Sequence, residues 1–118
     1  MMWVRVGSFL MAAGILLGAF GAHGLKAILD AGQMEVFKTA VFYQIVNALG
    51  LILIGTLSLQ TPSRSKLLPS GALLTAGTLL FSGSLYLMTM NGMTNLAFLT
   101  PIGGICLVVG WIFLIFTF

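Results

Sequence analysis

Charged residues divide this chain into long uncharged stretches, and the first two of these are each about the length of a membrane span. The first runs from Val6 to Leu25 and the second from Thr39 to Ser63. After Lys66 no Lys, Arg, Asp or Glu appears, and the remaining stretch, Leu67 to Phe118, has room for two spans and a turn. A helix needs roughly 20 apolar residues to cross the hydrocarbon core of a bilayer, so the pattern predicts four spans.

Turn-forming residues place the boundary between the last two spans. The segment Asn91–Asn95 is rich in residues that leave a helix easily, and we predict helices at about residues 4–23, 35–59, 68–90 and 96–117. Pro101 then falls in the first turn or two of the fourth helix, where proline is tolerated. The first apolar run is longer than the core of a typical secretory signal, so we expect it to be retained as a span.

Composition agrees with a membrane location. Of the 118 residues, 59% are hydrophobic and 6% are charged, against about 25% charged in ordinary soluble domains. So few polar side chains cannot cover a surface that faces water. Most of the surface must therefore face lipid. We predict one all-α domain, residues 1–118, built as an integral membrane four-helix bundle in the cell (cytoplasmic) membrane. The net charge of +3 rests on five basic residues, which indicates no nucleic-acid partner.

Most of the charge lies in the first connection. The segment Gly24–Lys38 contains four of the charged residues, which are Lys26, Asp30, Glu35 and Lys38. Leu25, Ile28 and Leu29 form an apolar stripe at helical spacing beside them, which predicts a short amphipathic segment at the membrane interface. A solvated loop at the headgroups is the alternative.

The basic residues predict the orientation, because they favour the cytoplasmic side of short loops. Four spans put Arg5, Arg64 and Lys66 on the side of both termini, and Lys26 and Lys38 on the other side with the acids. Both termini are therefore expected in the cytoplasm.

Small residues mark the expected helix contacts, because lipid supplies little hydrophobic drive between helices and close packing must replace it. Gly14 and Gly18 lie one turn apart in the first helix, and Gly103 and Gly110 lie in the fourth. Trp111 is deep enough in the fourth helix to be a packing residue. These faces can pack within one bundle or between subunits, and the pattern leaves both open.

Polar side chains form a stripe on each of the two middle helices. The stripes consist of Thr39, Tyr43, Gln44 and Asn47 in the second helix and of Thr75, Thr78, Ser82 and Tyr86 in the third, with Ser84 off the stripe. Polar groups within lipid cost free energy unless they find partners. These side chains are therefore expected to meet one another or a ligand.

The stripes define a candidate ligand site between the helices, in the half of the membrane away from the termini. Its members are His23, Lys26, Tyr43, Gln44, Asn47, Ser82, Tyr86 and Thr100. The alternative is that they only hydrogen-bond helix to helix, which is ordinary in membranes; Thr75 and Thr78 can also bond to their own helix. His23 is either a proton or ligand group or a residue that faces the headgroups.

No catalytic pattern appears, and no metal site is expected. Met88, Met90 and Met93 could bind Cu(I) through their thioethers, but no histidine or cysteine lies nearby in sequence to complete a site, and packing is the favoured role. One histidine and one cysteine, Cys106, are too few for a metal site. The chain lacks a Ser/His/Asp set, paired carboxylates in a span and a glycine-rich phosphate loop. The pattern disfavours an enzyme, and no cofactor is expected.

Short strings of residues resemble a known family. They are Gly18–Leu25 (GAFGAHGL), Thr39-Ala40 with Tyr43-Gln44 and Ala48-Leu49, Phe81–Tyr86 (FSGSLY), Thr100–Gly104 (TPIGG) and Gly110-Trp111. With them the chain resembles, over essentially its whole length, the small bacterial membrane proteins of domain of unknown function 423. This group is also called uncharacterised protein family 0382 and includes the eukaryotic transmembrane protein 256. The resemblance implies four membrane helices and no established activity.

One position departs from the pattern of that family, which commonly has a histidine where this chain has Asn47. Asparagine keeps the hydrogen bonding but cannot titrate. The resemblance therefore implies no relay between two histidines here.

The leading hypothesis is a non-enzymatic membrane protein with an interhelical polar pocket for a lipid, a quinone or another small amphipath. It would work as a homo-oligomer or beside a partner membrane protein. The rival is a small transporter or channel lined by the same residues. Conduction needs polar groups through both leaflets, whereas the halves near the termini are apolar, as in Ile52–Ile54 and Phe113–Phe116. This favours the pocket.

Overall fold

Four long helices make up most of the chain. The computed structural model describes residues 1–92 and 94–118, with Arg64 described by its backbone alone. The helices are α1 (Met2–His23), α2 (Ala31–Ser58), α3 (Leu68–Asn91) and α4 (Leu99–Thr117), and the short 3-10 segments η1 (Arg64–Leu67) and η2 (Thr94–Leu96) precede α3 and α4. All four are long and apolar enough to cross a membrane. The predicted all-α integral membrane architecture is confirmed.

Helix α2 begins at Ala31, four residues before the predicted start. Asp30 caps it, because one oxygen of the Asp30 carboxylate accepts from the Gln33 backbone N–H at 2.7 Å. In turn, the Gln33 side-chain oxygen accepts a hydrogen bond from the Asp30 backbone N–H at 3.0 Å. This capping box satisfies backbone groups that the first turn leaves open. It explains why the charged start of α2 is helical.

The connection between α1 and α2 is a series of turns and not an amphipathic helix. The Ile28 and Leu29 N–H groups donate to the Leu25 carbonyl at 3.0 and 2.9 Å. Leu25 and Leu29 are buried and pack with Phe37, while Ile28 is exposed. The predicted apolar stripe is therefore divided, because two of its members belong to the core.

The turn between α3 and α4 lies where it was predicted. Gly92 ends α3 with φ of 66°, in the left-handed region that glycine enters without steric cost. Met93, within the predicted turn, is outside the described residues. Helix α4 begins at Leu99, so Pro101 occupies its first turn, where a missing N–H breaks no helical hydrogen bond.

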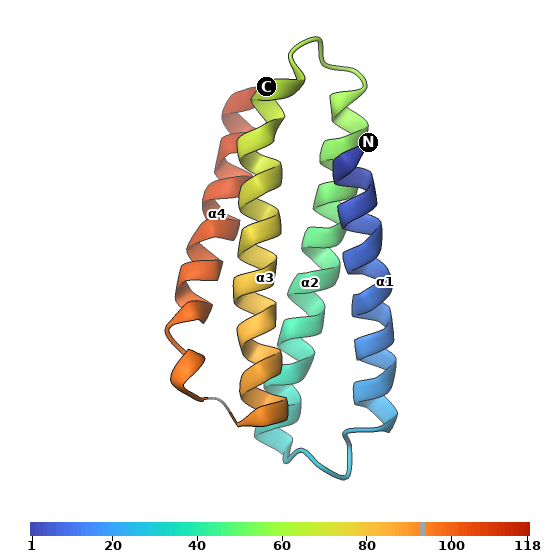
Figure 1. Cartoon of the computed structure of the whole chain (residues 1–118), viewed down its shortest axis with the longest axis vertical. Helices are drawn as coiled ribbons and strands as arrows, with labels where there is room; N and C mark the ends of the chain where they lie inside the picture. The colour runs from blue at the N-terminus through green and yellow to red at the C-terminus, as the bar shows by residue number, and fades with distance from the viewer. Residues whose placement is uncertain (93) are drawn as a thin grey trace.

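Each helix packs mainly against its neighbours in the chain, so the helices stand in the order α1, α2, α3, α4 across the molecule (Figure 1). Helices α2 and α3 are central, with 44% and 39% of their spans buried, whereas α1 and α4 have 22% and 17%. Both termini lie at the same end of the bundle, on its two outer helices (Figure 1). The bundle is an open row with two outer edges.

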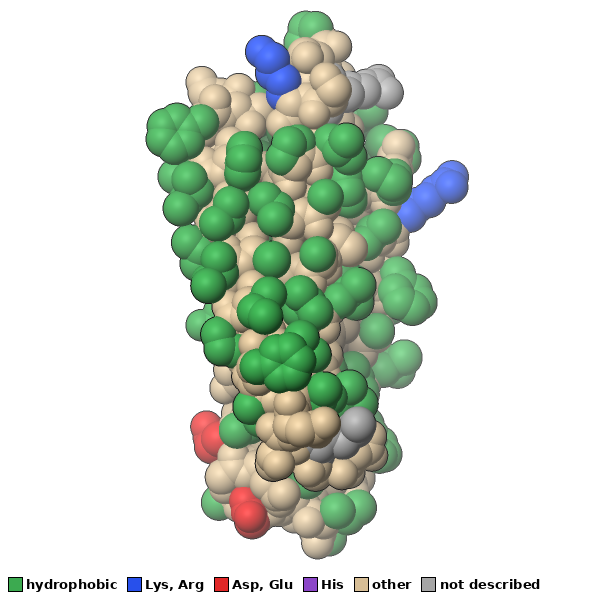
Figure 2. Space-filling model, turned by 60° about the vertical axis from the view of Figure 1, so that its left-hand side comes forward, with side chains coloured by type: hydrophobic (Ala, Val, Ile, Leu, Met, Phe, Trp, Pro, Cys, Tyr) green, Lys and Arg blue, Asp and Glu red, His purple; other side chains and the backbone are tan. Residues whose placement is uncertain are grey.

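Hydrophobic side chains cover the sides of this row. Figure 2 shows them along most of the height of one face, with acidic side chains only near its lower end. Phe9 and Leu16 of α1 and Ile105 and Phe116 of α4 are among the large apolar side chains that are mostly exposed. An apolar surface of this extent is typical of a protein whose sides face lipid.

Glycines let neighbouring helices approach closely. A Cβ atom at Gly7 of α1 would lie 2.6 Å from the Ala48 carbonyl oxygen of α2. A Cβ at Gly103 of α4 would overlap the backbone of α3 at Phe81 and lie 2.9 Å from the Leu80 carbonyl carbon. Close backbone approach of this kind is how membrane helices replace the missing hydrophobic drive.

Two tryptophans reach helices that are not their neighbours in the row. Trp3 of α1 packs against Gly71 of α3, and Trp111 of α4 packs against Gly50 of α2. In both places a Cβ on the glycine would overlap the indole ring. The two contacts link α1 with α3 and α2 with α4, and so hold the row in shape.

Replacing Gly103 with alanine should weaken the α3–α4 contact, because the new methyl group must displace the backbone of α3. Overpacking of this kind costs about 1–3 kcal/mol. The matched control is Gly83→Ala in α3, where an added Cβ meets nothing within 4 Å, and this change should not destabilise the protein. Unfolding in detergent, followed by helical circular dichroism, measures both, and equal loss of stability in the two variants would contradict the close contact.

Candidate ligand-binding site

The Gln44 side chain joins three helices. It is buried in α2, with 4% of its surface exposed. Its Nε2 donates to the Leu10 carbonyl of α1 at 2.7 Å, and its Oε1 accepts from the Tyr86 hydroxyl of α3 at 2.6 Å. An amide in lipid is costly unless it is bonded, and here both of its ends are.

The Asn47 side chain reaches the fourth helix. It lies about one turn after Gln44 and is 2% exposed. Its Nδ2 donates to the Tyr43 carbonyl in its own helix at 2.8 Å, and its Oδ1 accepts from the Trp111 indole N–H at 2.9 Å. Together the two amides connect α2 to every other helix of the row.

Two serines of α3 add further bonds between helices. The Ser82 hydroxyl donates to the Ala40 carbonyl of α2 at 2.8 Å. The Ser84 and Thr100 hydroxyls lie 2.6 Å apart and join α3 to α4. Ser84 is a residue that the sequence reasoning left out, because it lies off the helical stripe that Ser82 and Tyr86 share. Its partner, Thr100, lies on α4, which packs on another side of α3. The helical spacing within α3 alone does not indicate that contact.

The threonines of α3 behave differently from these serines. The Thr75 and Thr78 hydroxyls donate to the Gly71 and Leu74 carbonyls, one turn back in the same helix. Such bonds satisfy the hydroxyl without linking helices. Thr75 and Thr78 therefore bond within their own helix, which is the alternative given for them in the sequence analysis.

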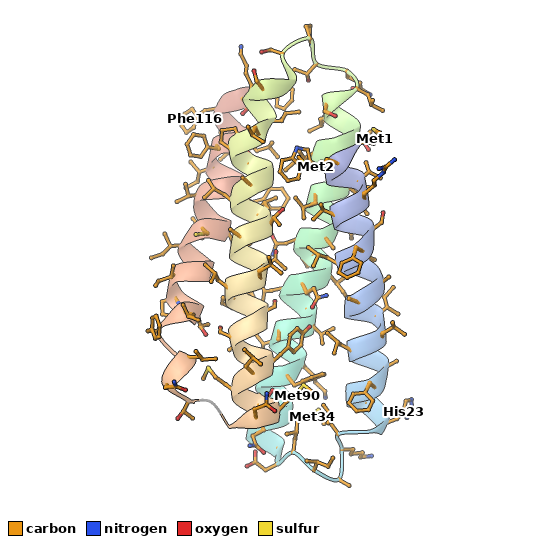
Figure 3. All side chains as sticks on the ribbon, viewed as in Figure 1. Met1, Met2, His23, Met34, Met90 and Phe116 are labelled. Atoms are coloured by element: carbon orange, nitrogen blue, oxygen red, sulfur yellow. The ribbon has the colours of Figure 1, made fainter. Side chains whose placement is uncertain are left out.

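His23 and Lys26 lie apart from these contacts. Both are exposed, at the end of α1 and in the turn after it. Figure 3 shows the His23 side chain at the lower end of α1, directed away from the other helices. The structure thus bonds Gln44 to Tyr86 and, about one turn further along α2, Asn47 to Trp111. It does not bring His23 or Lys26 to either pair.

A groove between α2 and α4, which we call the α2–α4 groove, is the main open space beside these bonds. Its volume is about 560 Å³, and Phe81 of α3 forms part of its floor. Tyr43 and Asn47 are the members of the predicted site that line it. The other lining residues are Val46, Pro101, Gly104, Ile105, Leu107, Val108, Val109 and Trp111.

The chemistry of this groove is nearly all apolar. Tyr43 is 41% exposed and packs edge-on against Phe81, with the ring centroids 4.9 Å apart. The phenol can donate or accept a hydrogen bond, and no acidic or basic side chain lines the groove. In the part of the chain that the structure describes, no three His, Cys, Asp or Glu side chains gather to hold a metal ion. The groove suits an apolar chain with one neutral polar group.

Fold and site together define a multi-spanning membrane protein whose interior polar groups bond from helix to helix. The profile of the family described as "Protein of unknown function (DUF423)" matches residues 17–104. The chain is also 39% identical over 114 residues to the UPF0382 membrane protein SH2409 of Staphylococcus haemolyticus, covering 97% of this chain and 92% of that protein. The chain belongs to this family of membrane proteins, as its sequence strings implied.

Two further bacteria carry similar proteins. The UPF0382 membrane protein YwdK of Bacillus subtilis is 37% identical, over 90% of this chain and 85% of that protein. The UPF0382 inner membrane protein YgdD of Escherichia coli is 35% identical, over 82% of this chain and 73% of that protein. No solved structure matches the chain.

The bond between Gln44 and Tyr86 should be measurable as a coupling free energy. We expect the single variants Gln44→Leu and Tyr86→Phe each to lower stability, and the double variant to lose less than their sum. The difference should be about 0.6 kcal/mol and at most about 1.7 kcal/mol, the average and the maximum for hydrogen bonds between membrane helices. Unfolding in detergent gives the four stabilities of the cycle.

Thr117→Val is the control for that cycle, because the Thr117 hydroxyl bonds only one turn back, to the Phe113 carbonyl. Combined with Tyr86→Phe it should give no coupling. A zero coupling between Gln44 and Tyr86 would show that their bond adds nothing to stability.

Proposed function

We propose that the protein binds a membrane amphipath in the α2–α4 groove and catalyses no reaction. The observation that carries this proposal is the groove itself. Its volume of about 560 Å³ lies within the 300–1,000 Å³ typical of small-molecule sites. Its walls are apolar apart from Tyr43 and Asn47 of α2. The Asn47 amide already bonds to the Tyr43 carbonyl and to Trp111, so the Tyr43 phenol is the polar group that a ligand would meet. A long apolar chain with a compact head group fits this combination.

The depth of Tyr43 favours a neutral head group, as in a quinone. Tyr43 lies 12 residues after Ala31 and 15 before Ser58, which is about 18 and 22 Å at 1.5 Å per residue. The hydrocarbon core of a bilayer is about 30 Å thick, so this position is well inside it. A charged phosphate is costly there, whereas a quinone carbonyl can accept a hydrogen bond from the phenol.

The remaining residues of the candidate site act indirectly in this proposal. Gln44, Ser82, Tyr86 and Thr100 hold the helices that form the groove and are positioning residues. His23 and Lys26 would lie at the headgroups, outside the groove. A phospholipid remains an alternative occupant, with one acyl chain in the groove and its head at the surface.

Transport is supported less well. The interior side chains of Gln44, Asn47 and Tyr86 bond to groups within the protein, and the groove beside them is apolar. A conducting path needs polar groups through both leaflets. Flux of ions into liposomes that contain the purified protein would reverse this preference.

We also propose that the protein works as a homo-oligomer or as a subunit beside another membrane protein. The outer helices α1 and α4 are the least buried spans of the row, so a further helix has room to pack there. Cys106 in α4 is partly exposed and is the only cysteine. Bis-maleimide or oxidative cross-linking through Cys106 in native membranes should give a dimer if α4 faces a second copy, and its absence would point to a different partner or edge.

The orientation stays a prediction from the basic residues, with both termini in the cytoplasm. A reporter enzyme fused after Phe118 that is active only in the cytoplasm should be active. Activity of an export-dependent reporter at that position would reverse the orientation.

Filling the α2–α4 groove should abolish binding. A Cβ at Gly104 would lie 3.6 Å from the Phe81 ring, an ordinary contact, so Gly104→Leu can place its side chain in the groove without moving the backbone. We expect the half-saturating quinone concentration to rise at least about tenfold, equivalent to about 1.4 kcal/mol. Gly83→Leu is the control, because it adds the same side chain where an added Cβ meets nothing within 4 Å.

Quenching of Trp111 fluorescence by a quinone in reconstituted vesicles measures this binding. The background variant is Trp3→Phe, which leaves Trp111, a groove residue, as the only tryptophan. Saturable quenching that Gly104→Leu removes and Gly83→Leu keeps is the expected result. Quenching that is equal in both variants would mean that the quinone meets Trp111 only by collision from the lipid, and the proposal would fail. A lipid brominated on its acyl chain, used in place of the quinone, tests the phospholipid alternative.

A further inference from the structure

A second groove, between α1 and α3, ends at a charged side chain. We call it the α1–α3 groove. It has a volume of about 380 Å³ and is lined by Arg5, Val6, Phe9, Leu10, Thr75 and Leu79. It shares no lining residue with the α2–α4 groove. Arg5 is its one charged group, and Phe9 beside it is 72% exposed.

Arg5 has no acidic side chain at its end of the molecule. Asp30 and Glu35 are the only Asp and Glu residues of the chain, and both lie at the start of α2, at the opposite end. The C-terminal end of the chain lies on α4, the outer helix at the other edge of the row from α1 (Figure 1). Lys66, before α3 at the same end as Arg5, is a further positive charge. The counter-charge for Arg5 must therefore come from outside the chain.

Arg5 also lies at a depth where a lipid headgroup can supply that charge. A Cβ at Gly55 of α2 would lie 2.9 Å from the Val4 nitrogen, so Val4 is level with Gly55. Helix α2 continues to Ser58, about one turn further. The base of the Arg5 side chain is thus about one turn inside the end of the bundle, from where a long basic side chain reaches toward the headgroups.

We propose that the α1–α3 groove binds an anionic phospholipid, with its phosphate on the Arg5 guanidinium and one acyl chain along Val6, Phe9 and Leu79. A guanidinium binds phosphate through two parallel hydrogen bonds. A zwitterionic lipid carries its own cation beside the phosphate, so a lipid with net negative charge complements Arg5 better. The site is separate from the α2–α4 groove, and neither proposal depends on the other.

The basic residue at the other end provides the contrast. Lys38 lines a groove of about 300 Å³ between α1 and α2, so it too combines a cation with apolar walls. Its end of the molecule contains Asp30 and Glu35 beside Lys26 and Lys38, so these four side chains carry no net charge together. The preference for an anionic lipid is therefore expected at Arg5 and not at Lys38.

Trp3 can report on a lipid in this groove, because it packs against Gly71 of α3, one turn before the groove residue Thr75. In a Trp111→Phe background, Trp3 is the only tryptophan. The protein is reconstituted into phosphatidylcholine vesicles that contain a small fraction of brominated phosphatidylglycerol or of brominated phosphatidylcholine. The ratio of the two quenching efficiencies measures the preference for the anionic headgroup.

We expect phosphatidylglycerol to be preferred about fivefold, the scale of one basic residue at an anionic membrane surface. Arg5→Gln should bring the ratio close to one, and Arg5→Lys should keep part of it because the charge remains. Lys38→Gln, with its charge change at the opposite end, and Gly104→Leu, in the other groove, should leave the ratio unchanged. A ratio near one in the parent, an unchanged ratio in Arg5→Gln, or an equal loss in Lys38→Gln would each overturn the proposal. So would loss of the preference on adding millimolar inorganic phosphate at constant ionic strength, because a site that needs the acyl chain does not yield to the free anion.

Discussion

Two amide side chains within the bilayer interior must find hydrogen-bond partners, and the arrangement of the helices follows from how they do so. Gln44 contacts α1 and α3, and Asn47 contacts α4. An unbonded amide in hydrocarbon costs several kcal/mol, so a rotation of α2 that released either side chain would be strongly opposed. Because α2 is a central helix of the row, fixing its rotation also fixes the faces that it offers to its neighbours.

The same contacts shape the proposed ligand site. The Trp111 indole bonds to Asn47, packs against Gly50 and forms part of the wall of the α2–α4 groove. Its ring therefore has one firmly held position, and the width of the groove depends on it. These hydrogen bonds leave mostly apolar surface for a ligand, since the strongest polar groups already bond to each other. This is why an apolar chain with a single weakly polar head fits the geometry better than a charged solute.

The spans could be predicted from the spacing of the charges, because each uncharged run must cross the same hydrocarbon thickness. The start of α2 was predicted four residues too late, because the capping pair Asp30 and Gln33 lies among charged residues that resemble a solvated loop. Helical spacing correctly indicated that the side chains of Gln44, Asn47 and Tyr86 point toward other helices. It could not indicate that Trp111, 64 residues after Asn47, is a partner.

Two features of the candidate site lay beyond that reasoning. Ser84 was set aside because a stripe describes one face of a helix, whereas α3 is central and uses several faces. His23 was grouped with the stripe because their residues share one half of the membrane, although its side chain points away from the bundle (Figure 3). Depth along the membrane and direction around a helix are independent coordinates, and sequence spacing gives the second only within a single helix.

Among the residues that the structure describes, three side-chain hydrogen bonds join the two halves of the chain, and they run in one direction. Tyr86, Ser82 and Trp111 of the second hairpin donate, and Gln44, the Ala40 carbonyl and Asn47 of the first accept. The first hairpin therefore contributes the acceptors of these bonds, and the second hairpin contributes the donors. Two copies of the first hairpin cannot replace this pairing by the same bonds, because neither carries those donors. The two halves are thus complementary in these three bonds, and neither half contains both partners of any of them.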